Sequence, residues 1–303
     1  MPLEPEIASL VSDFIAAGRP SSRSQTYEAR RAGYVDSTVL AGEIEQRVNV
    51  EDVVIDGISL RVVSPSNADE ILPAVIYFHG GCFVSGGFAT HDNQLRQLAF
   101  FSGCRVIAVQ YRLAPEHVYP AAHDDAERAA NLIREHAGRL GVDRRRLAFA
   151  GDSAGAHIAL ITALRLRDAG HWLPQQLVLI YPMIDATASS ASHQRNGFDY
   201  VLTSDTLLSG FEAYYPDTDF MHPEVSPLWR DDFSGLPPVY IITAEYDPLC
   251  DEGEMLFTRL TEQGVSCTAQ RYPGVIHGFF QLGGISQTAR NAMRDIAARL
   301  STL

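Results

Sequence analysis

The sequence GDSAG occupies residues 151–155, directly after an apolar run of strand length at residues 147–150 and at the start of a helical pattern. A strand, this motif and a helix in that order form a nucleophile elbow, a sharp and strained turn that exposes the serine hydroxyl. Its glycines avoid side-chain clashes that would forbid the turn. The alternative is that Ser153 only caps the helix. We interpret Ser153 as a nucleophile, because other motifs in the chain supply the partners that it needs.

The rest of the chain alternates between strand-like and helical segments. It opens with a predicted antiparallel hairpin, because β-rich runs at residues 48–55 and 58–63 flank the turn sequence Asp56-Gly57. The alternation that follows predicts an α/β fold, with a mostly parallel central sheet covered by helices on both faces. The expected strands are residues 74–78, 105–110, 147–150, 177–181, 239–244 and 266–271, and the expected helices are residues 92–101, 121–140, 154–168, 251–263 and 285–300.

Two stretches interrupt this alternation and predict a helical cap over one edge of the sheet. Residues 1–45 and 185–234 contain helical patterns and no convincing strand. The remaining residues, 46–184 and 235–303, are expected to form the core domain. A chain of 303 residues can hold one large α/β domain with a modest addition of this kind.

A glycine pair upstream of the elbow predicts an oxyanion hole. His79, Gly80 and Gly81 follow the expected strand at residues 74–78. Such a loop can turn backbone N–H groups toward a developing oxyanion, and the N–H after the nucleophile completes the set. We therefore expect the donors to be the N–H groups of Gly80, Gly81 and Ala154.

A serine nucleophile needs a base, and the base needs a carboxylate to orient it. In serine hydrolases with this elbow the acid and then the histidine come later in the chain, each in a loop after a strand. Asp247 follows the expected strand at residues 239–244, and His277 follows the one at residues 266–271. The sequence therefore predicts a Ser153, Asp247 and His277 triad.

Several other polar residues compete for these roles. His157 is one helical turn after Ser153 and is expected to pack along the helix rather than reach the hydroxyl. Asp251 and Glu252 are explained by the favourable effect of acids at a helix start. A fourth candidate, the group His117, His123, Asp124 and Asp125, straddles a helix start after a proline and is interpreted as a solvated first turn, so no metal site is expected.

Composition limits the partners and the compartment. The net charge is −13 and the chain has no lysine, so we expect no nucleic acid partner. No apolar run is long enough for a membrane span, and Glu4 and Glu6 stand where a signal peptide would need basic residues. The four cysteines show neither a disulfide framework nor metal-ligand spacing, so a cytoplasmic location is expected.

Taken together, the motifs resemble the hormone-sensitive-lipase-like branch of the α/β-hydrolase superfamily, the bacterial family IV esterases. The resemblance covers roughly residues 45–300 and implies an α/β-hydrolase fold, the triad and oxyanion donors named above, and a helical cap over the acyl pocket. It depends on HGG at residues 79–81, YRLAPE at 111–116, GDSAG at 151–155, DPL at 247–249 with DEG at 251–253, and HGF at 277–279.

One position departs from the family pattern, which has a third glycine where this chain has Cys82. A left-handed backbone there would cost a side chain about 1 to 2 kcal/mol. Cys82 is a candidate for thiol labelling near the pocket, although a buried, inert cysteine is the commoner case. The family's YRLAPE segment is interpreted as structural, with an expected tie between Arg112 and Glu116 that supports the site.

The resemblance implies a serine carboxylesterase that hydrolyses short-acyl-chain esters through an acyl-enzyme, without a cofactor. One alternative is a binding protein on the same fold, like the hormone receptors that have lost the catalytic histidine, but His277 is present. A long-chain lipase or a peptidase is the other alternative. The partner expected is a small-molecule ester, and a homodimer is suggested only by analogy with the family.

Overall fold

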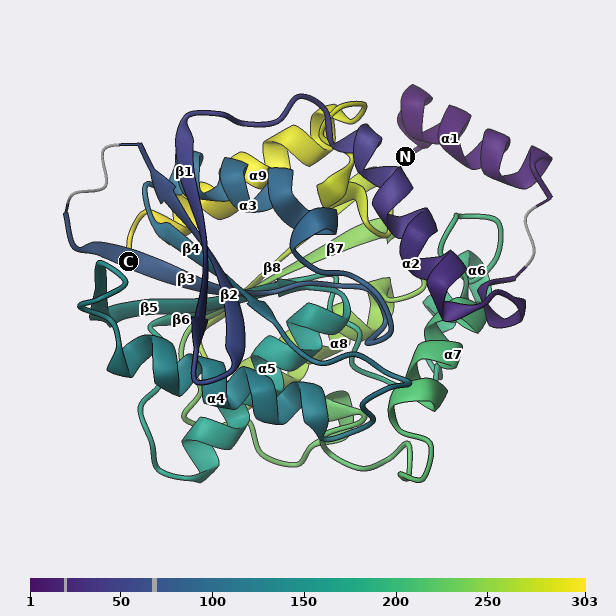
Figure 1. Ribbon diagram of the computed structural model, residues 1–303. Coiled ribbons are helices and arrows are strands. Elements are labelled where there is room, and N and C mark those ends of the chain that lie inside the picture. The colour runs from purple at the N-terminus through teal and green to yellow at the C-terminus, as the bar shows by residue number, and fades with distance from the viewer. Residues whose placement is uncertain (19–20, 67–69) are drawn as a thin grey trace.

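The centre of the protein is one eight-stranded sheet in the order β1-β2-β4-β3-β5-β6-β7-β8 (Figure 1). The structure is a computed structural model that describes residues 1–18, 21–66 and 70–303. β2 runs antiparallel to both β1 and β4, whereas the strands from β4 to β8 are parallel. The strands are β1 (Val48–Ile55), β2 (Ile58–Pro65), β3 (Leu72–Phe78), β4 (Arg105–Gln110), β5 (Val142–Asp152), β6 (Gln176–Ile180), β7 (Val239–Tyr246) and β8 (Cys267–Ile276).

Helices cover both faces of the sheet, as the alternation predicts (Figure 1). α3 (Phe88–Ser102) and α9 (Gln287–Leu300) lie on one face, and α4 (Ala121–Glu135), α5 (Ala154–Asp168) and α8 (Cys250–Glu262) lie on the other. Successive residues of a strand point to opposite faces. Buried apolar residues therefore form two clusters, one on each side of the sheet.

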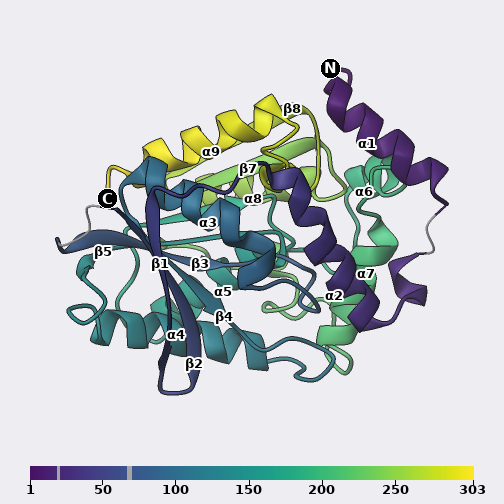
Figure 2. The same ribbon diagram turned by 45° about the horizontal axis from the view of Figure 1, so that its top comes forward.

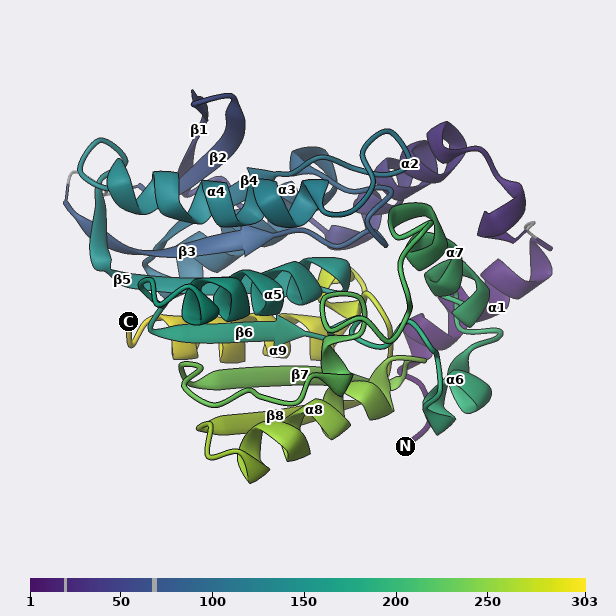
Figure 3. The ribbon, with the colours of Figure 1, turned by 90° about the horizontal axis from the view of Figure 1, so that it is seen from below.

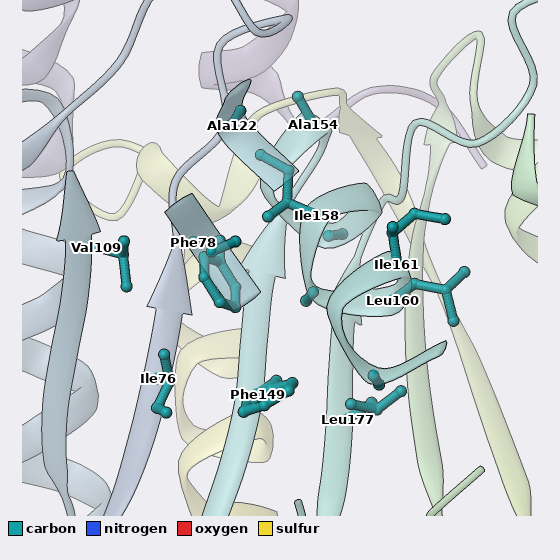
Figure 4. Packing of buried hydrophobic residues seen from close by; sticks show 14 of the residues in the cluster. Ile76, Phe78, Val109, Ala122, Phe149, Ala154, Ile158, Leu160, Ile161 and Leu177 are labelled. Atoms are coloured by element: carbon teal, nitrogen blue, oxygen red, sulfur yellow. The ribbon is translucent and has the colours of Figure 1, made fainter. Parts of the chain in front are cut away.

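β3 and β5 illustrate this packing. Ile76, Phe78 and Phe149 point toward α5, which carries Ile158 (Figure 4). All four side chains are fully buried. Burying one such side chain contributes about 1.5 to 3 kcal/mol, so this layer holds the elbow between β5 and α5 in place.

β5 and β8 extend furthest beyond the bounds that the sequence predicts. β8 continues past residue 271 to Ile276, because Ile276 pairs with Tyr246 of β7 after a shift in register. β5 begins at Val142, which pairs with Leu72 of β3, and its first residues include the exposed Arg144 and Arg145. Both extensions depend on pairing with a neighbouring strand, although the β8 extension also buries Tyr272, Val275 and Ile276. α4 is shorter than predicted and ends at Glu135.

The remaining helices gather beyond the carboxyl ends of the parallel strands (Figures 2 and 3). They are α1 (Pro5–Ala16), α2 (Tyr27–Asp36), α6 (Ala191–Asn196) and α7 (Ser204–Tyr214), with 3₁₀ turns η1 (Ser22–Ser24), η2 (Ser37–Ala41), η3 (Pro227–Trp229) and η4 (Phe279–Gln281).

The two cap stretches predicted from the sequence contact each other between η1 and α7. Arg23 of η1 forms an ion pair with Asp205 of α7 at 2.7 Å, and also pairs with Glu212. α1 behaves differently, since its Ile7 and Val11 pack into the cluster on the α9 face of the sheet.

Within the described part of the chain, no helix combines the length and apolar character needed to cross a bilayer.

Candidate active site

Ser153 lies on the turn between β5 and α5. Its backbone has φ +56° and ψ −120°, a conformation that is strained for a residue with a side chain. The turn is held by a hydrogen bond from the Ser153 N–H to the Ile180 carbonyl oxygen, at 2.8 Å. A Cβ at Gly155 would come within 2.0 Å of the Phe78 carbonyl oxygen, so only glycine fits there. The GDSAG motif therefore forms the predicted elbow.

The three predicted triad residues come together at the carboxyl ends of β5, β7 and β8. His277 Nε2 lies 3.1 Å from Ser153 Oγ, and His277 Nδ1 lies 2.7 Å from Asp247 Oδ2. Asp247 is fully buried, and its other oxygen accepts a hydrogen bond from the Leu249 N–H at 2.8 Å. The His277 ring packs against Tyr181, with ring centroids 4.5 Å apart. This geometry allows a proton to pass from the serine hydroxyl to a histidine held in one orientation.

The loop after β3 differs from the expectation in one donor. The Gly80 N–H donates to Asp152 Oδ1 at 3.0 Å, so it is not free for an oxyanion, and its assignment as a donor is wrong. Among the described residues, the N–H groups of Gly81, Cys82 and Ala154 have no acceptor. Cys82 has φ +53°, so the position where the family has a third glycine does adopt a left-handed backbone.

Asp152 is a site residue that the sequence reasoning missed. Besides the Gly80 N–H, its carboxylate accepts a hydrogen bond from the Tyr77 hydroxyl at 2.8 Å and lies 3.1 Å from His91 Nε2. Burial opposes ionisation, but the charge and hydrogen bond of His91 and the Tyr77 hydroxyl outweigh it and lower the pKa of Asp152. The residue before the nucleophile thus ties the elbow to the oxyanion loop. The available signal was a charged residue between a buried strand and the nucleophile.

His79 fixes the other side of the same loop. Its carbonyl oxygen accepts a hydrogen bond from the Tyr111 hydroxyl at 2.5 Å, and the two rings stack with centroids 4.2 Å apart. Its Nδ1 lies 2.8 Å from the Gly80 carbonyl oxygen. Burial lowers the pKa of His79 to about 3, so the ring is neutral and donates from Nδ1 to that carbonyl.

The competing histidine is a packed helix residue, as expected. His157 is fully buried, and its Nδ1 lies 2.9 Å from the Met183 carbonyl oxygen. Burial lowers its pKa to about 4. Its second nitrogen faces the Glu224 carbonyl oxygen at 3.1 Å. A neutral ring carries one N–H, so one nitrogen donates to one of these carbonyl oxygens, and Nε2 also lies 3.1 Å from the Tyr215 hydroxyl. Neither nitrogen pairs with Ser153 Oγ, which leaves His277 as the base.

The two competing acids differ from each other. Asp251 forms an ion pair with Arg195 at 2.7 Å and lies in the first turn of α8, as the helix-start interpretation requires. Glu252 is fully buried, accepts a hydrogen bond from the Ile184 N–H at 2.7 Å and lies 3.3 Å from His193 Nε2 of α6. Burial raises its pKa to about 7. The helix dipole alone therefore does not explain Glu252, because its carboxylate connects His193 of α6 to the backbone at Ile184.

The expected tie between Arg112 and Glu116 is wrong. Arg112 binds Asp125 through both carboxylate oxygens, at 2.8 Å each. Glu116 binds Arg31 of α2 at 2.7 Å. The Arg31 guanidinium also donates to the Val84 carbonyl oxygen at 2.8 Å, so a residue from the N-terminal stretch supports the oxyanion loop. These partners are distant in sequence, and no local spacing indicates them.

The group considered for a metal site is not a solvated turn, and that interpretation is wrong in part. His123 is fully buried with Nδ1 2.9 Å from the Tyr214 hydroxyl, and Asp125 is buried against Arg112. His117 is exposed, and Asp124 pairs with Arg165 at 2.9 Å. Within the described residues, no group of three His, Cys, Asp or Glu side chains could hold a metal ion.

Comparison with known proteins agrees with this geometry. Residues 75–281 match the family described as the alpha/beta hydrolase fold. The chain is 35% identical over 304 residues to the ethyl acetate hydrolase of Pseudomonas putida, covering 95% of both proteins. It is 32% identical to the arylesterase of Saccharolobus solfataricus, covering 100% of this chain and 99% of that one. The solved structure of the hyperthermophilic esterase from the archaeon Pyrobaculum calidifontis matches with a TM-score of 0.93 and 39% identity, covering 100% and 99% of the two chains.

The chain therefore belongs to the α/β-hydrolase family, in its hormone-sensitive-lipase-like branch. Within that family it is a carboxylesterase, and the non-catalytic alternative is not favoured.

Proposed function

We propose that this carboxylesterase uses Ser153, Asp247 and His277 to hydrolyse carboxylic esters of short acyl chains. The main support is the chain of contacts from Asp247 Oδ2 through His277 to Ser153 Oγ. Ser153 Oγ attacks the ester carbonyl carbon while His277 Nε2 accepts its proton. His277 returns that proton to the leaving alcohol, which leaves an acyl-enzyme. Water then attacks the acyl carbon while His277 Nε2 accepts its proton. His277 returns that proton to Ser153 Oγ as the acyl-enzyme bond breaks, which releases the acid.

The oxyanion of each tetrahedral intermediate is assigned to the N–H groups of Gly81, Cys82 and Ala154. The hydrogen bond from the Gly80 N–H to Asp152 holds the loop that carries the Gly81 and Cys82 N–H groups. The Ala154 N–H is held because Ala154 is the first residue of α5. Backbone donors of this kind, fixed before the reaction starts, account for a large share of the rate enhancement in acyl transfer. The assignment replaces Gly80 with Cys82 in the set expected from the sequence.

We assign residues 1–45 and 185–234 to a cap that limits the acyl pocket, leaving 46–184 and 235–303 as the core domain. Support comes from α7, whose Phe211 and Tyr214 lie beside Phe83 of the oxyanion loop at 5.9 and 4.8 Å between ring centroids. A relative named for ethyl acetate hydrolysis also favours a small acyl group. Each added methylene gains about 0.8 kcal/mol until such a pocket is full, after which steric cost takes over.

The test is an acyl-length series of chromogenic esters with the wild-type protein and with Ser153→Ala. We expect the highest kcat/KM for acyl chains of about two to six carbons and a sharp fall beyond about ten. Ser153→Ala should lose nearly all activity at every length, because triad members act as a unit. A variant that keeps more than about a tenth of the activity contradicts the nucleophile assignment, and a flat profile to long chains contradicts the pocket.

We further propose a homodimer that forms through β8. β8 is the last strand of the sheet, and among the described residues its outer edge pairs with no other strand. An unpaired edge is a template for pairing with another chain. Light scattering after size-exclusion chromatography tests this proposal, and a monomer at micromolar concentration would contradict it.

For the compartment, we propose the cytoplasm. All four cysteine thiols are free, and three of them are buried in the core. Free thiols are typical of a reducing compartment, whereas oxidising compartments favour disulfides. Cell fractionation with antibody detection tests this, and recovery of the protein outside the cytoplasm would contradict it.

A further inference from the structure

One glycine of cap helix α7 touches the oxyanion loop directly. Gly210 is buried within α7 and faces Cys82. A Cβ added at residue 210 would lie 2.6 Å from the Cys82 carbonyl oxygen and 2.7 Å from the Cys82 Cβ. Nonbonded heavy atoms reach their best separation at about 3.5 to 4.0 Å, so any side chain at residue 210 must push one of the two segments away.

The loop segment under α7 has a conformation that its surroundings impose. Cys82 has φ +53° and Phe83 has φ +64°, both in the region that favours glycine. Residues with side chains remain in that region only when neighbouring structure holds them there. The Phe83 ring stacks on Tyr214 of α7 at 4.8 Å, and Arg31 of α2 binds the Val84 carbonyl oxygen. Residues of the cap therefore contact three successive residues of this loop, Cys82, Phe83 and Val84.

We propose that Gly210 is a positioning residue for ester hydrolysis, because its close approach sets where the Cys82 N–H points. The inference rests on the proposed function, in which that N–H is an oxyanion donor. Cys82 brings a side chain to a position where the family pattern has glycine. A glycine on the opposing helix gives that side chain the room that the left-handed turn needs.

The proposal has a distinct kinetic signature. A donor displaced by a few tenths of an ångström weakens its hydrogen bond to the oxyanion, which exists only in the transition state and the tetrahedral intermediate. An interaction of that kind affects kcat and leaves ground-state binding unchanged. Loss of a whole oxyanion donor costs about 10²- to 10³-fold in kcat, so a misplaced donor should cost roughly 10- to 100-fold.

The first experiment compares Gly210→Ala with Gly33→Ala. Both glycines lie inside cap helices, but a Cβ at Gly33 of α2 meets no atom within 4 Å. We expect Gly33→Ala to keep the wild-type kcat and KM. Gly210→Ala should lower kcat by roughly 10- to 100-fold with KM changed less than twofold. Circular dichroism and a melting curve show whether each variant is folded.

A second readout separates a misplaced donor from general damage. A trifluoromethyl ketone forms a tetrahedral adduct with the serine, whereas the corresponding secondary alcohol cannot. In Gly210→Ala the inhibition constant of the ketone should rise by the same factor as kcat/KM falls, and that of the alcohol should not change. Equal weakening of both inhibitors, or a wild-type kcat in a folded Gly210→Ala protein, would overturn the proposal.

A third comparison covers the case in which Gly210→Ala does not fold. Cys82→Gly removes the 2.7 Å contact and leaves the 2.6 Å contact with the carbonyl oxygen. The double variant Cys82→Gly with Gly210→Ala should then fold and have a lower kcat than Cys82→Gly alone. Equal kcat values in these two proteins would overturn the proposal. Failure of the proposed function itself would instead appear as activity retained in Ser153→Ala.

Discussion

Two aspartates four positions apart have separate roles in this site. Asp247 is fully buried and holds His277, whereas Asp251 only pairs with the half-exposed Arg195. Asp247→Asn should lower kcat by about 10⁴-fold, because an amide favours the wrong imidazole tautomer. Asp251→Asn should change it little, since exposed ion pairs contribute about 0 to 1 kcal/mol. Steady-state kinetics of the two variants decide between them, and a larger loss in Asp251→Asn would show that the acid is misassigned.

The four thiols give a second test at this scale. Burial raises the pKa of Cys82 to about 11 and those of Cys250 and Cys267 to about 12, and it also raises the pKa of Cys104. Because the thiolate is the reactive form, the native protein should react only slowly with a disulfide reagent at pH 8. Release of the chromophore should reach four equivalents after denaturation. Rapid labelling of Cys82 in the native state would contradict its burial in the loop.

At the scale of elements, the sequence predicts what is local and misses what a neighbour decides. The hairpin, the parallel strands and the helices carry apolar periodicity of their own, so their existence is predicted. The extension of β8 to Ile276 is not, because the added residues are in the sheet through their pairing with β7. The proximity of Ser153, Asp247 and His277 could be predicted because each residue follows a strand. The partners of Asp152 and Arg31 were not predicted, because they lie 53 to 85 residues away along the chain.

The contact between α6 and α8 predicts a pH-dependent contribution to stability. Burial raises the pKa of Glu252 to about 7 from an ordinary 4.5. At a pH between these two pKa values, Glu252 is protonated in the folded protein but has lost its proton in the unfolded chain. The stability that Glu252 contributes is therefore complete below pH 4.5 and is lost as the pH rises toward and through 7.

Glu252→Gln removes that titration and keeps an oxygen for the Ile184 N–H. Relative to wild type, the free energy of unfolding of the variant should therefore increase between pH 5 and pH 8, measured by urea denaturation. Glu262→Gln, at the exposed end of the same helix, serves as the control and should show no such change. A pH-independent difference for Glu252→Gln would contradict the raised pKa.

For the whole molecule, the N-terminal stretch supports both the core and the site. Ile7 and Val11 pack on the sheet, and Arg31 binds the oxyanion loop. Deleting residues 1–40 should therefore lower the melting temperature as well as kcat, because buried apolar surface is lost together with the loop support. Arg31→Ala should lower kcat with little change in melting temperature. Full activity in the truncated protein would show that this stretch has no role in the site.

Asp152 has a consequence for how the enzyme can be redesigned. Motif searches treat the position before the nucleophile as a wildcard, and libraries that diversify an active site often include it. Here that carboxylate accepts hydrogen bonds from the Tyr77 hydroxyl and the Gly80 N–H while it faces His91. No uncharged side chain offers two acceptor oxygens at that site without a donor. Directed evolution of this esterase should leave residue 152 fixed and place its diversity at other positions, excluding Gly210 and Arg31, which contact the oxyanion loop.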